Sequence, residues 1–298
     1  MRSEEEIGLK TIIFHLREYY TLVRFEHAVM LAVAVLIAEI ITLGTFPSIE
    51  LVFFLSLTVP IFAEMGSFGL NDYMDVETDR INGMQMRPLV KGTISPKNAL
   101  YFSMFCFMVS IVSGFFINTS AFLIALFFSA FAIAYNWKLK DLPLLGNIFI
   151  GTTMAIPFIF GGYVYSGSPP GVIWDIAVLG FIAGVAREIV KSVEDIKGDV
   201  EIRSSKTLPT IIGKGPSVFV ASMLFLLFIP LTIVPFTNEL TLAFASGFFL
   251  FIADFSILVL SLYLLYARRD KSFSIIRKYS LGALFCGLLS LLLASVGL

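Results

Sequence analysis

Nine long apolar stretches constrain what this 298-residue chain can fold into. Each is close to the roughly twenty residues that a helix needs to cross a bilayer. Their approximate bounds are 27–44, 49–71, 98–117, 119–136, 144–166, 170–190, 216–236, 239–267 and 275–297. Because 57% of the residues are hydrophobic and the mean hydropathy is +0.89, a soluble fold is excluded. We expect one all-α, polytopic membrane domain over residues 1–298, with about nine transmembrane helices around a central cavity.

Charged and apolar residues are mixed in segment 10–26, which precedes the first apolar stretch. This composition predicts an amphipathic helix lying in the membrane interface. The acidic first residues predict no cleavable signal peptide. Cys106 and Cys286 both lie in apolar stretches, so we expect free, buried thiols rather than a disulfide.

The distribution of Lys and Arg predicts the orientation in the membrane. All 21 of these residues can be placed on one side when nine spans are counted. The positive-inside rule then puts the N-terminus in the cytoplasm and the C-terminus outside an integral, multi-pass cell-membrane protein. The net charge of −1 argues against a nucleic-acid partner.

Two acidic clusters interrupt this apolar pattern. One extends from Asn71 to Asp79 at the end of the second stretch, and the other from Glu194 to Asp199 after the sixth. Carboxylates at membrane depth are costly, and such groups are therefore functional candidates. An even number of crossings separates the clusters, so both are expected at the cytoplasmic face, in loops at about 72–97 and 191–215. We therefore expect an active site at that face.

The spacing within the clusters favours a metal. Helical periodicity puts Asp72, Asp75 and Asp79 on one face, with Asn71 one turn before Asp75. In the second cluster, Asp195 and Asp199 are one turn apart and continue a stripe that begins with Arg187 and Lys191. Clustered oxygen ligands favour Mg²⁺, here two ions that bridge to phosphates. The chain has no Cys/His pattern for zinc.

Basic residues follow each acidic cluster and favour a diphosphate ligand. Arg80, Arg87 and Lys91 follow the first cluster, and Arg203 and Lys206 follow the second. Such cations bind phosphate oxygens and stabilise a departing diphosphate. A diphosphate leaves readily from an allylic carbon, and an intramembrane cavity rich in phenylalanine would hold a prenyl tail. A single DxxxD pattern usually marks a solvated helix face, but two copies at membrane ends favour metal–diphosphate binding.

At these motifs the chain resembles the UbiA superfamily of intramembrane prenyltransferases. The resemblance rests on Asn71-Asp72-x-x-Asp75-x-x-x-Asp79 with Arg87-Pro88, and on Asp195-x-x-x-Asp199 with Lys206-Thr207-Leu208-Pro209. A third motif, Tyr135-Asn-Trp-Lys138-Leu-Lys140 followed by Gly146-Asn147, is similar to a Tyr/Lys segment of the family. The family implies transfer of a prenyl group from a polyprenyl diphosphate through an allylic cation.

The resemblance also implies roles for individual residues. The expected metal ligands are Asn71, Asp72, Asp75, Asp79, Asp195 and Asp199. The expected diphosphate-binding residues are Arg24, Arg87, Lys91, Lys138, Lys140, Lys191, Arg203 and Lys206. The expected catalytic residues are Asp75, Asp195, Tyr135 and Lys140, with the Tyr135 ring or oxygen steadying the cation. The spacing from Tyr135 leaves open whether Lys138 or Lys140 contacts the diphosphate.

The acceptor stays open between two classes. An aromatic acceptor similar to 4-hydroxybenzoate would belong to quinone synthesis. Segment 188–195 looks instead like family members that alkylate geranylgeranylglyceryl phosphate, which makes digeranylgeranylglyceryl phosphate synthase the alternative. Segment 87–92 departs from the pattern usual in those members. The donor would be a diphosphate such as geranylgeranyl diphosphate, with a prenyl length that the sequence does not give.

Two other classes are less well supported. An ion-coupled transporter would place ionisable groups near the bilayer midplane, whereas these clusters lie at the ends of spans. A membrane CDP-alcohol phosphotransferase would carry a compact Asp-Gly-x-x-Ala-Arg motif, which this sequence lacks. Two intramembrane carboxylates, Glu64 and Asp254, receive no role from the sequence.

Overall fold

The computed structural model describes the backbone of residues 2–298 except 82, 143, 197–205 and 267–269, and side chains apart from those of 2–10, 141 and 270–271. Within this part of the chain all regular structure is helical, in agreement with the expected fold class. The helices are α1 (Arg2–Val23), α2 (Phe25–Leu43), α3 (Leu51–Ile81), α4 (Pro88–Lys91), α5 (Pro96–Ile117), α6 (Thr119–Trp137), η1 (Leu139–Asp141), α7 (Leu145–Tyr165), α8 (Gly171–Glu194), α10 (Leu208–Ile212), α11 (Lys214–Leu231), α12 (Val234–Asn238), α13 (Phe244–Tyr266) and α14 (Asp270–Ser295).

Local sequence explains where several helices begin and end. Ser95 caps α5 by accepting a hydrogen bond from the backbone N–H of Asn98, and Pro96 follows at the first helical position. Asn118 caps α6 by accepting from the backbone N–H of Ala121 at 2.8 Å. Gly44 ends α2 with a positive φ of 67°, which glycine adopts without a steric penalty.

Each of the nine apolar stretches corresponds to helix in the structure, but not all of these helices qualify as membrane spans by length and composition. Among the described residues, eight helices are long and apolar enough to cross a membrane. The stretch at 170–190 becomes α8, which has 24 residues but is not one of the eight. Its C-terminal half carries Arg187, Glu188 and Lys191. The count of nine spans therefore stays a prediction.

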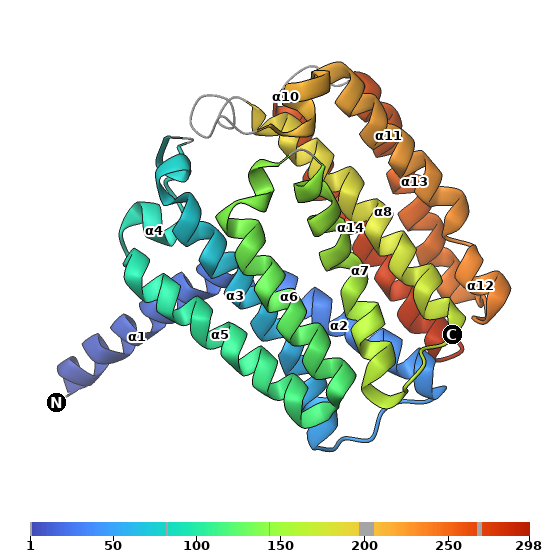
Figure 1. The fold of residues 1–298 in the computed structure, drawn as a ribbon, viewed down its shortest axis with the longest axis horizontal. Helices are drawn as coiled ribbons and strands as arrows, with labels where there is room; N and C mark the ends of the chain where they lie inside the picture. The colour runs from blue at the N-terminus through green and yellow to red at the C-terminus, as the bar shows by residue number, and fades with distance from the viewer. Residues whose placement is uncertain (1, 82, 143, 197–205, 267–269) are drawn as a thin grey trace.

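The long helices pack side by side in one bundle (Figure 1). Neighbouring pairs lead from α2 to α3, α5, α6, α7 and α8, and then through α11 and α13 to α14, which returns to α2. In Figure 1, α10 lies at the top and α4 at the left, whereas α12 and the C-terminus lie at the right. The α1 helix projects from the bundle beside α2 and α3.

The contact between α7 and α8 is especially close. A Cβ atom added at Gly184 would lie 2.8 Å from the Cα of Gly151, and one added at Gly180 would lie 2.5 Å from the carbonyl oxygen of Met154. Small residues allow membrane helices to approach in this way. Elsewhere the hydroxyls of Ser222 and Ser261 form reciprocal bonds between α11 and α13 at 2.9–3.0 Å.

Candidate active site

The first acidic cluster forms a buried carboxylate face near the end of α3. Asp72, Asp75 and Asp79 are 2%, 8% and 6% exposed, and their spacing of three and four residues aligns them along the helix. Buried carboxylates require partners, because an isolated charge in an apolar interior is strongly unfavourable.

Three cations from separate segments supply those partners. The Arg24 Nη2 atom lies 3.1 Å from Oδ1 of Asp72, and the Arg87 guanidinium donates both to the same oxygen at 3.1 Å and to Asp79. The Lys140 ammonium donates to Asp75. We call this set of three Asp and three cations, Asp72, Asp75, Asp79, Arg24, Arg87 and Lys140, the α3 charge cluster.

Arg24 is held by an unusual backbone conformation. Its φ of 46° and ψ of 56° are left-handed, and this residue separates α1 from α2. The guanidinium carbon lies 4.4 Å above the ring of Phe68, in addition to the ion pair with Asp72. Burial lowers the pKa of Arg24, whereas the charge of Asp72 opposes that change. A strained non-glycine residue at a charged cluster is typical of a functional site.

Asn71 and Tyr135 join the α3 charge cluster to α6. The Asn71 amide donates to Oδ2 of Asp75 at 3.1 Å and to the amide oxygen of Asn136 at 3.0 Å. Tyr135 is 6% exposed, and its ring stacks on Phe149 with centroids 4.4 Å apart. The Tyr135–Lys140 motif therefore lies beside the first acidic motif, as its predicted shared function requires.

The two candidate lysines of that motif lie in different surroundings. Lys140, in η1, pairs with Asp75, whereas Lys138 is exposed at the end of α6. The geometry thus favours Lys140 as the residue near a ligand of the cluster.

Lys91 is directed elsewhere. Its ammonium lies 2.8 Å from Oε1 of Glu18, and the Thr93 hydroxyl donates to the other oxygen of that carboxylate. The hydrogen bonds from Lys91 and Thr93 hold the pKa of Glu18 below its usual value. These contacts fasten α4 to α1, so Lys91 would have to leave Glu18 to reach a diphosphate.

The second acidic cluster is only partly described. Asp195 is half-buried at the C-cap of α8, and its backbone N–H donates to the Lys191 carbonyl at 2.9 Å. Lys206 is exposed before α10. The expected ligands Asp199 and Arg203 lie outside the described residues. Among the described residues, no group of three or more Asp, Glu, His or Cys side chains is arranged as a metal site would require.

A cavity of about 350 Å³, which we call the main chamber, opens beside the α3 charge cluster. Asn71, Arg24 and Tyr135 line one side, and Arg187, Lys191 and Arg277 also line it. Most other lining residues are apolar and come from α7, α8 and α14. The main chamber therefore combines charged groups with an apolar interior, as a site for an amphiphilic ligand must.

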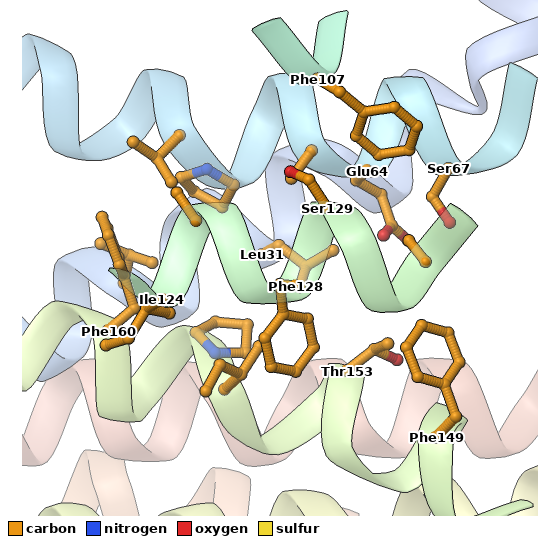
Figure 2. A pocket seen from close by; sticks show the side chains of 18 residues that line it. Leu31, Glu64, Ser67, Phe107, Ile124, Phe128, Ser129, Phe149, Thr153 and Phe160 are labelled. Atoms are coloured by element: carbon orange, nitrogen blue, oxygen red, sulfur yellow. The ribbon is translucent and has the colours of Figure 1, made fainter. Parts of the chain in front are cut away.

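A smaller cavity of about 70 Å³ shares Glu64, Ser67, Phe149 and Thr153 with the main chamber. Figure 2 shows these four side chains toward one end of the smaller cavity, with Ile124 and Phe160 at the other and Phe128 between. The shared residues connect the two cavities, and the far end is apolar.

Sequence reasoning did not identify several of these contacts. The contact of Asn136 with Asn71 could have been suspected, because Asn136 directly follows Tyr135 in the motif. Nothing in the sequence indicates that Glu18 pairs with Lys91 or that Arg277 lines the main chamber. No partner for Asp254 could be predicted from the sequence, whereas in the structure the Thr232 hydroxyl donates a hydrogen bond to its Oδ2 atom at 2.9 Å.

Comparison with known proteins identifies the family. The model of the UbiA prenyltransferase family matches residues 30–281. This chain belongs to that family. It is accordingly an integral membrane prenyltransferase, as the sequence motifs predicted.

Curated relatives within the family share one name. Digeranylgeranylglyceryl phosphate synthase from Thermococcus gammatolerans is 32% identical over 70% of this chain and 73% of its own length. The synthase of the same name from Methanopyrus kandleri is 33% identical over 75% of this chain and 80% of its own.

Solved structures show the same fold. One from work on digeranylgeranylglyceryl phosphate synthase in membranes matches with a TM-score of 0.73 and 26% identity, over 95% of this chain and 99% of that one. A UbiA homologue from Archaeoglobus fulgidus, bound to GPP and Mg²⁺, has a TM-score of 0.62 at 18% identity, over 92% of this chain and 99% of that one.

Proposed function

We propose that this prenyltransferase transfers a geranylgeranyl-type chain from its diphosphate to the hydroxyl of a prenylated glyceryl phosphate, as a digeranylgeranylglyceryl phosphate synthase. The observation that carries the proposal is the shared name of relatives about one third identical over most of the chain. The proposed acceptor is therefore the prenylated glyceryl phosphate rather than an aromatic compound similar to 4-hydroxybenzoate.

The α3 charge cluster is the proposed site for the donor diphosphate. Arg24, Arg87 and Lys140 each contact a carboxylate of α3, so each lies within reach of a phosphate bound at that face. Arginine forks and a lysine ammonium suit the several oxygens of a diphosphate. Lys138, Lys91, Lys206 and Arg203 stay secondary candidates for the same role.

The proposed cofactor is Mg²⁺, in two ions as the two motifs suggest. The carboxylates of Asp72, Asp75 and Asp79 and the amide oxygen of Asn71 are hard oxygen donors, which fit Mg²⁺. Asp195 and Asp199 are the proposed ligands from the second motif. When bound, the ions would neutralise charge on the departing diphosphate.

The reaction breaks the allylic C–O bond to the diphosphate and forms a C–O bond to the acceptor hydroxyl, whose proton is released. Arg24, Arg87 and Lys140 would hold the leaving group, and the Tyr135 ring would face the allylic carbon while Phe149 fixes its orientation. The apolar walls of the chamber would keep water from capturing the cation. Glu64 lines both cavities and is a candidate acceptor for the hydroxyl proton.

The smaller cavity is the proposed seat of the distal part of the donor tail. Its far end is formed by apolar side chains, including Ile124 and Phe160 (Figure 2). The topology that accompanies this proposal keeps the N-terminus and the active site cytoplasmic and the C-terminus outside.

The test uses purified protein, labelled geranylgeranyl diphosphate and Mg²⁺, with geranylgeranylglyceryl phosphate and 4-hydroxybenzoate offered separately. We expect a diether product from the glyceryl phosphate, its loss in EDTA, and no prenylated benzoate. Product from 4-hydroxybenzoate alone would replace the proposed acceptor. Product that persists in EDTA would contradict the metal requirement.

A further inference from the structure

A second group of cations lies in the main chamber, away from the carboxylate face of α3. Arg187 and Lys191 come from one stripe of α8, and Arg277 comes from the start of α14. All three line the chamber, and we call them the α8–α14 cation group. Arg24, which lies between α1 and α2, lines the same cavity, so basic side chains from three parts of the chain reach it.

The pairing of this group leaves one charge without compensation. Lys191 lies 3.4 Å from Glu188, and Arg277 lies 2.7 Å from Glu194. No described carboxylate lies within ion-pair distance of Arg187. Its Nη2 donates to the backbone carbonyl of Arg277 at 3.4 Å. Its Nε is buried and has no hydrogen-bond partner.

A buried donor of this kind is unfavourable until something accepts its hydrogen bond. Arg187 lines a cavity, so a ligand can reach the Nε–H that the protein leaves unsatisfied. A ligand with several acceptor oxygens and negative charge would satisfy the guanidinium and the neighbouring Lys191 and Arg277 together.

The α8–α14 cation group is close enough to the α3 charge cluster to serve the same reaction. His27 on α2 lines the chamber and lies within electrostatic range of both Arg24 and Arg187. The cations of the α3 charge cluster are already matched by three carboxylates, whereas Arg187 is not. The chamber thus offers an anionic ligand a second group of cations besides Arg24 of the α3 charge cluster.

We infer that Arg187, Lys191 and Arg277 bind the phosphate monoester of the acceptor lipid, which moves Lys191 from the donor diphosphate predicted from the sequence to the acceptor. The inference rests on the proposed function. A phosphate monoester carries close to two negative charges at neutral pH and three acceptor oxygens, which matches two arginines and a lysine. The apolar residues between α8 and α14, including Phe228, Leu284 and Leu288, would receive the acceptor's hydrocarbon chain.

Direct binding tests this inference apart from catalysis. The detergent-purified full chain in EDTA would be titrated with geranylgeranylglyceryl phosphate and with geranylgeranylglycerol, which lacks the phosphate. We expect the phosphate to improve wild-type affinity about tenfold or more, as hydrogen bonds between charged groups do. Arg187→Gln and Arg277→Gln should each remove most of that advantage, and Arg187→Lys should remove less. Lys278→Gln, at an exposed position next to Arg277, is the matched control and should bind as the wild type does.

Steady-state kinetics then distinguish a failure of this inference from a failure of the proposed function. We expect Arg187→Gln to raise the KM for geranylgeranylglyceryl phosphate about tenfold or more while the KM for geranylgeranyl diphosphate stays within about twofold. A rise in the donor KM alone would move the site to the donor and overturn the inference. Equal affinity for phosphate and alcohol would also overturn it, even if the diether forms. Phosphate-dependent binding without diether formation would instead refute the proposed function and leave the anion site standing.

Bulk membrane lipid is the other source of phosphate. Phosphatidylglycerol, a phosphodiester with one charge, would be added as a competitor in the binding titration. We expect weak competition, at concentrations at least about tenfold above the monoester. Competition at equal concentration would identify an annular lipid site and overturn the assignment to the acceptor.

Discussion

The α3 charge cluster, whose Arg24 lines the main chamber, and the α8–α14 cation group, which lines it as a whole, are built differently. In the α3 charge cluster, each carboxylate forms an ion pair with a basic side chain of the protein. These side chains are Arg24, Arg87 and Lys140. In the second, Arg187 lacks a carboxylate among the described residues and keeps a buried donor unsatisfied. A matched cluster can be buried without a ligand, whereas an unmatched one is stabilised by binding an anion.

Such a difference in charge balance would allow a membrane enzyme to distinguish two phosphorylated lipids. A diphosphate with its metals brings its own positive charge and can exchange partners at a cluster that is already neutral. A metal-free phosphate monoester suits a site with surplus positive charge.

Asp75→Asn should lower turnover by about a thousandfold or more, because it removes a carboxylate from the face proposed to hold the metal. The protein should stay folded, since Asn keeps the size of the side chain and part of its hydrogen bonding to Asn71. Glu77→Gln, at an exposed position paired with Arg80 on the same helix, is the control and should retain activity. Steady-state rates with size-exclusion profiles of each variant provide the check, and a nearly normal Asp75→Asn rate would remove Asp75 from the site.

Lys140→Met should lower kcat about a hundredfold, the usual consequence of removing one donor to a developing negative charge. Lys138→Met should stay within about twofold, because Lys138 is exposed. The buried Asp75 would lose a partner in Lys140→Met, so this variant should be less stable and should regain more thermal stability from added Mg²⁺ than the wild type does. Equal losses from the two lysines would contradict the structural distinction between them.

Phe128→Trp should reduce kcat/KM for geranylgeranyl diphosphate about tenfold, because a larger side chain would occupy the smaller cavity. Dimethylallyl diphosphate is too short to reach that depth and should be used as well as before. Phe127→Trp is the matched control, since Phe127 is 63% exposed and does not line the smaller cavity. If both donors are affected alike, the smaller cavity does not hold the tail.

Glu18→Gln should have the smallest effect. It removes the ion pair with Lys91, which is partly exposed, and should lower the free energy of unfolding by about 0.5–1 kcal/mol. The lowered pKa of Glu18 means that its ion pair is fully formed above the ordinary glutamate pKa and is lost as the pH falls through the lowered value. The stability difference between wild type and variant should therefore stay constant from pH 7 down to the ordinary glutamate pKa and shrink below it, as followed by thermal unfolding. A difference that stays constant to below pH 4 would show that the charge of Glu18 is not what fastens α4 to α1.

The sequence predicted the parts of the site that depend on local spacing. Hydropathy located the helices, and periodicity placed Asp72, Asp75 and Asp79 on one face. It also put Arg187 and Lys191 on one stripe of α8, and both line the chamber. These features follow from helix geometry alone.

Contacts between distant segments could not be predicted in the same way. The choice of Lys140 over Lys138 depends on the short η1 turn after α6, and the place of Arg277 depends on how α14 packs beside α8. The partnership of Glu18 with Lys91 joins residues 73 positions apart. Spacing within a motif carries no information about such tertiary pairs.

The glycine contact between α7 and α8 has a consequence for acceptor choice. Phe149, which supports Tyr135, lies near Gly151 on α7, and Arg187 lies near Gly184 on α8. With the two backbones almost touching, the wall that carries both residues resists sliding. If the proposed sites hold, this rigid wall would fix the separation between the reacting carbon and the acceptor's phosphate. Acceptors would be sorted by the number of bonds between their hydroxyl and their phosphate, before the length of their hydrocarbon chain matters.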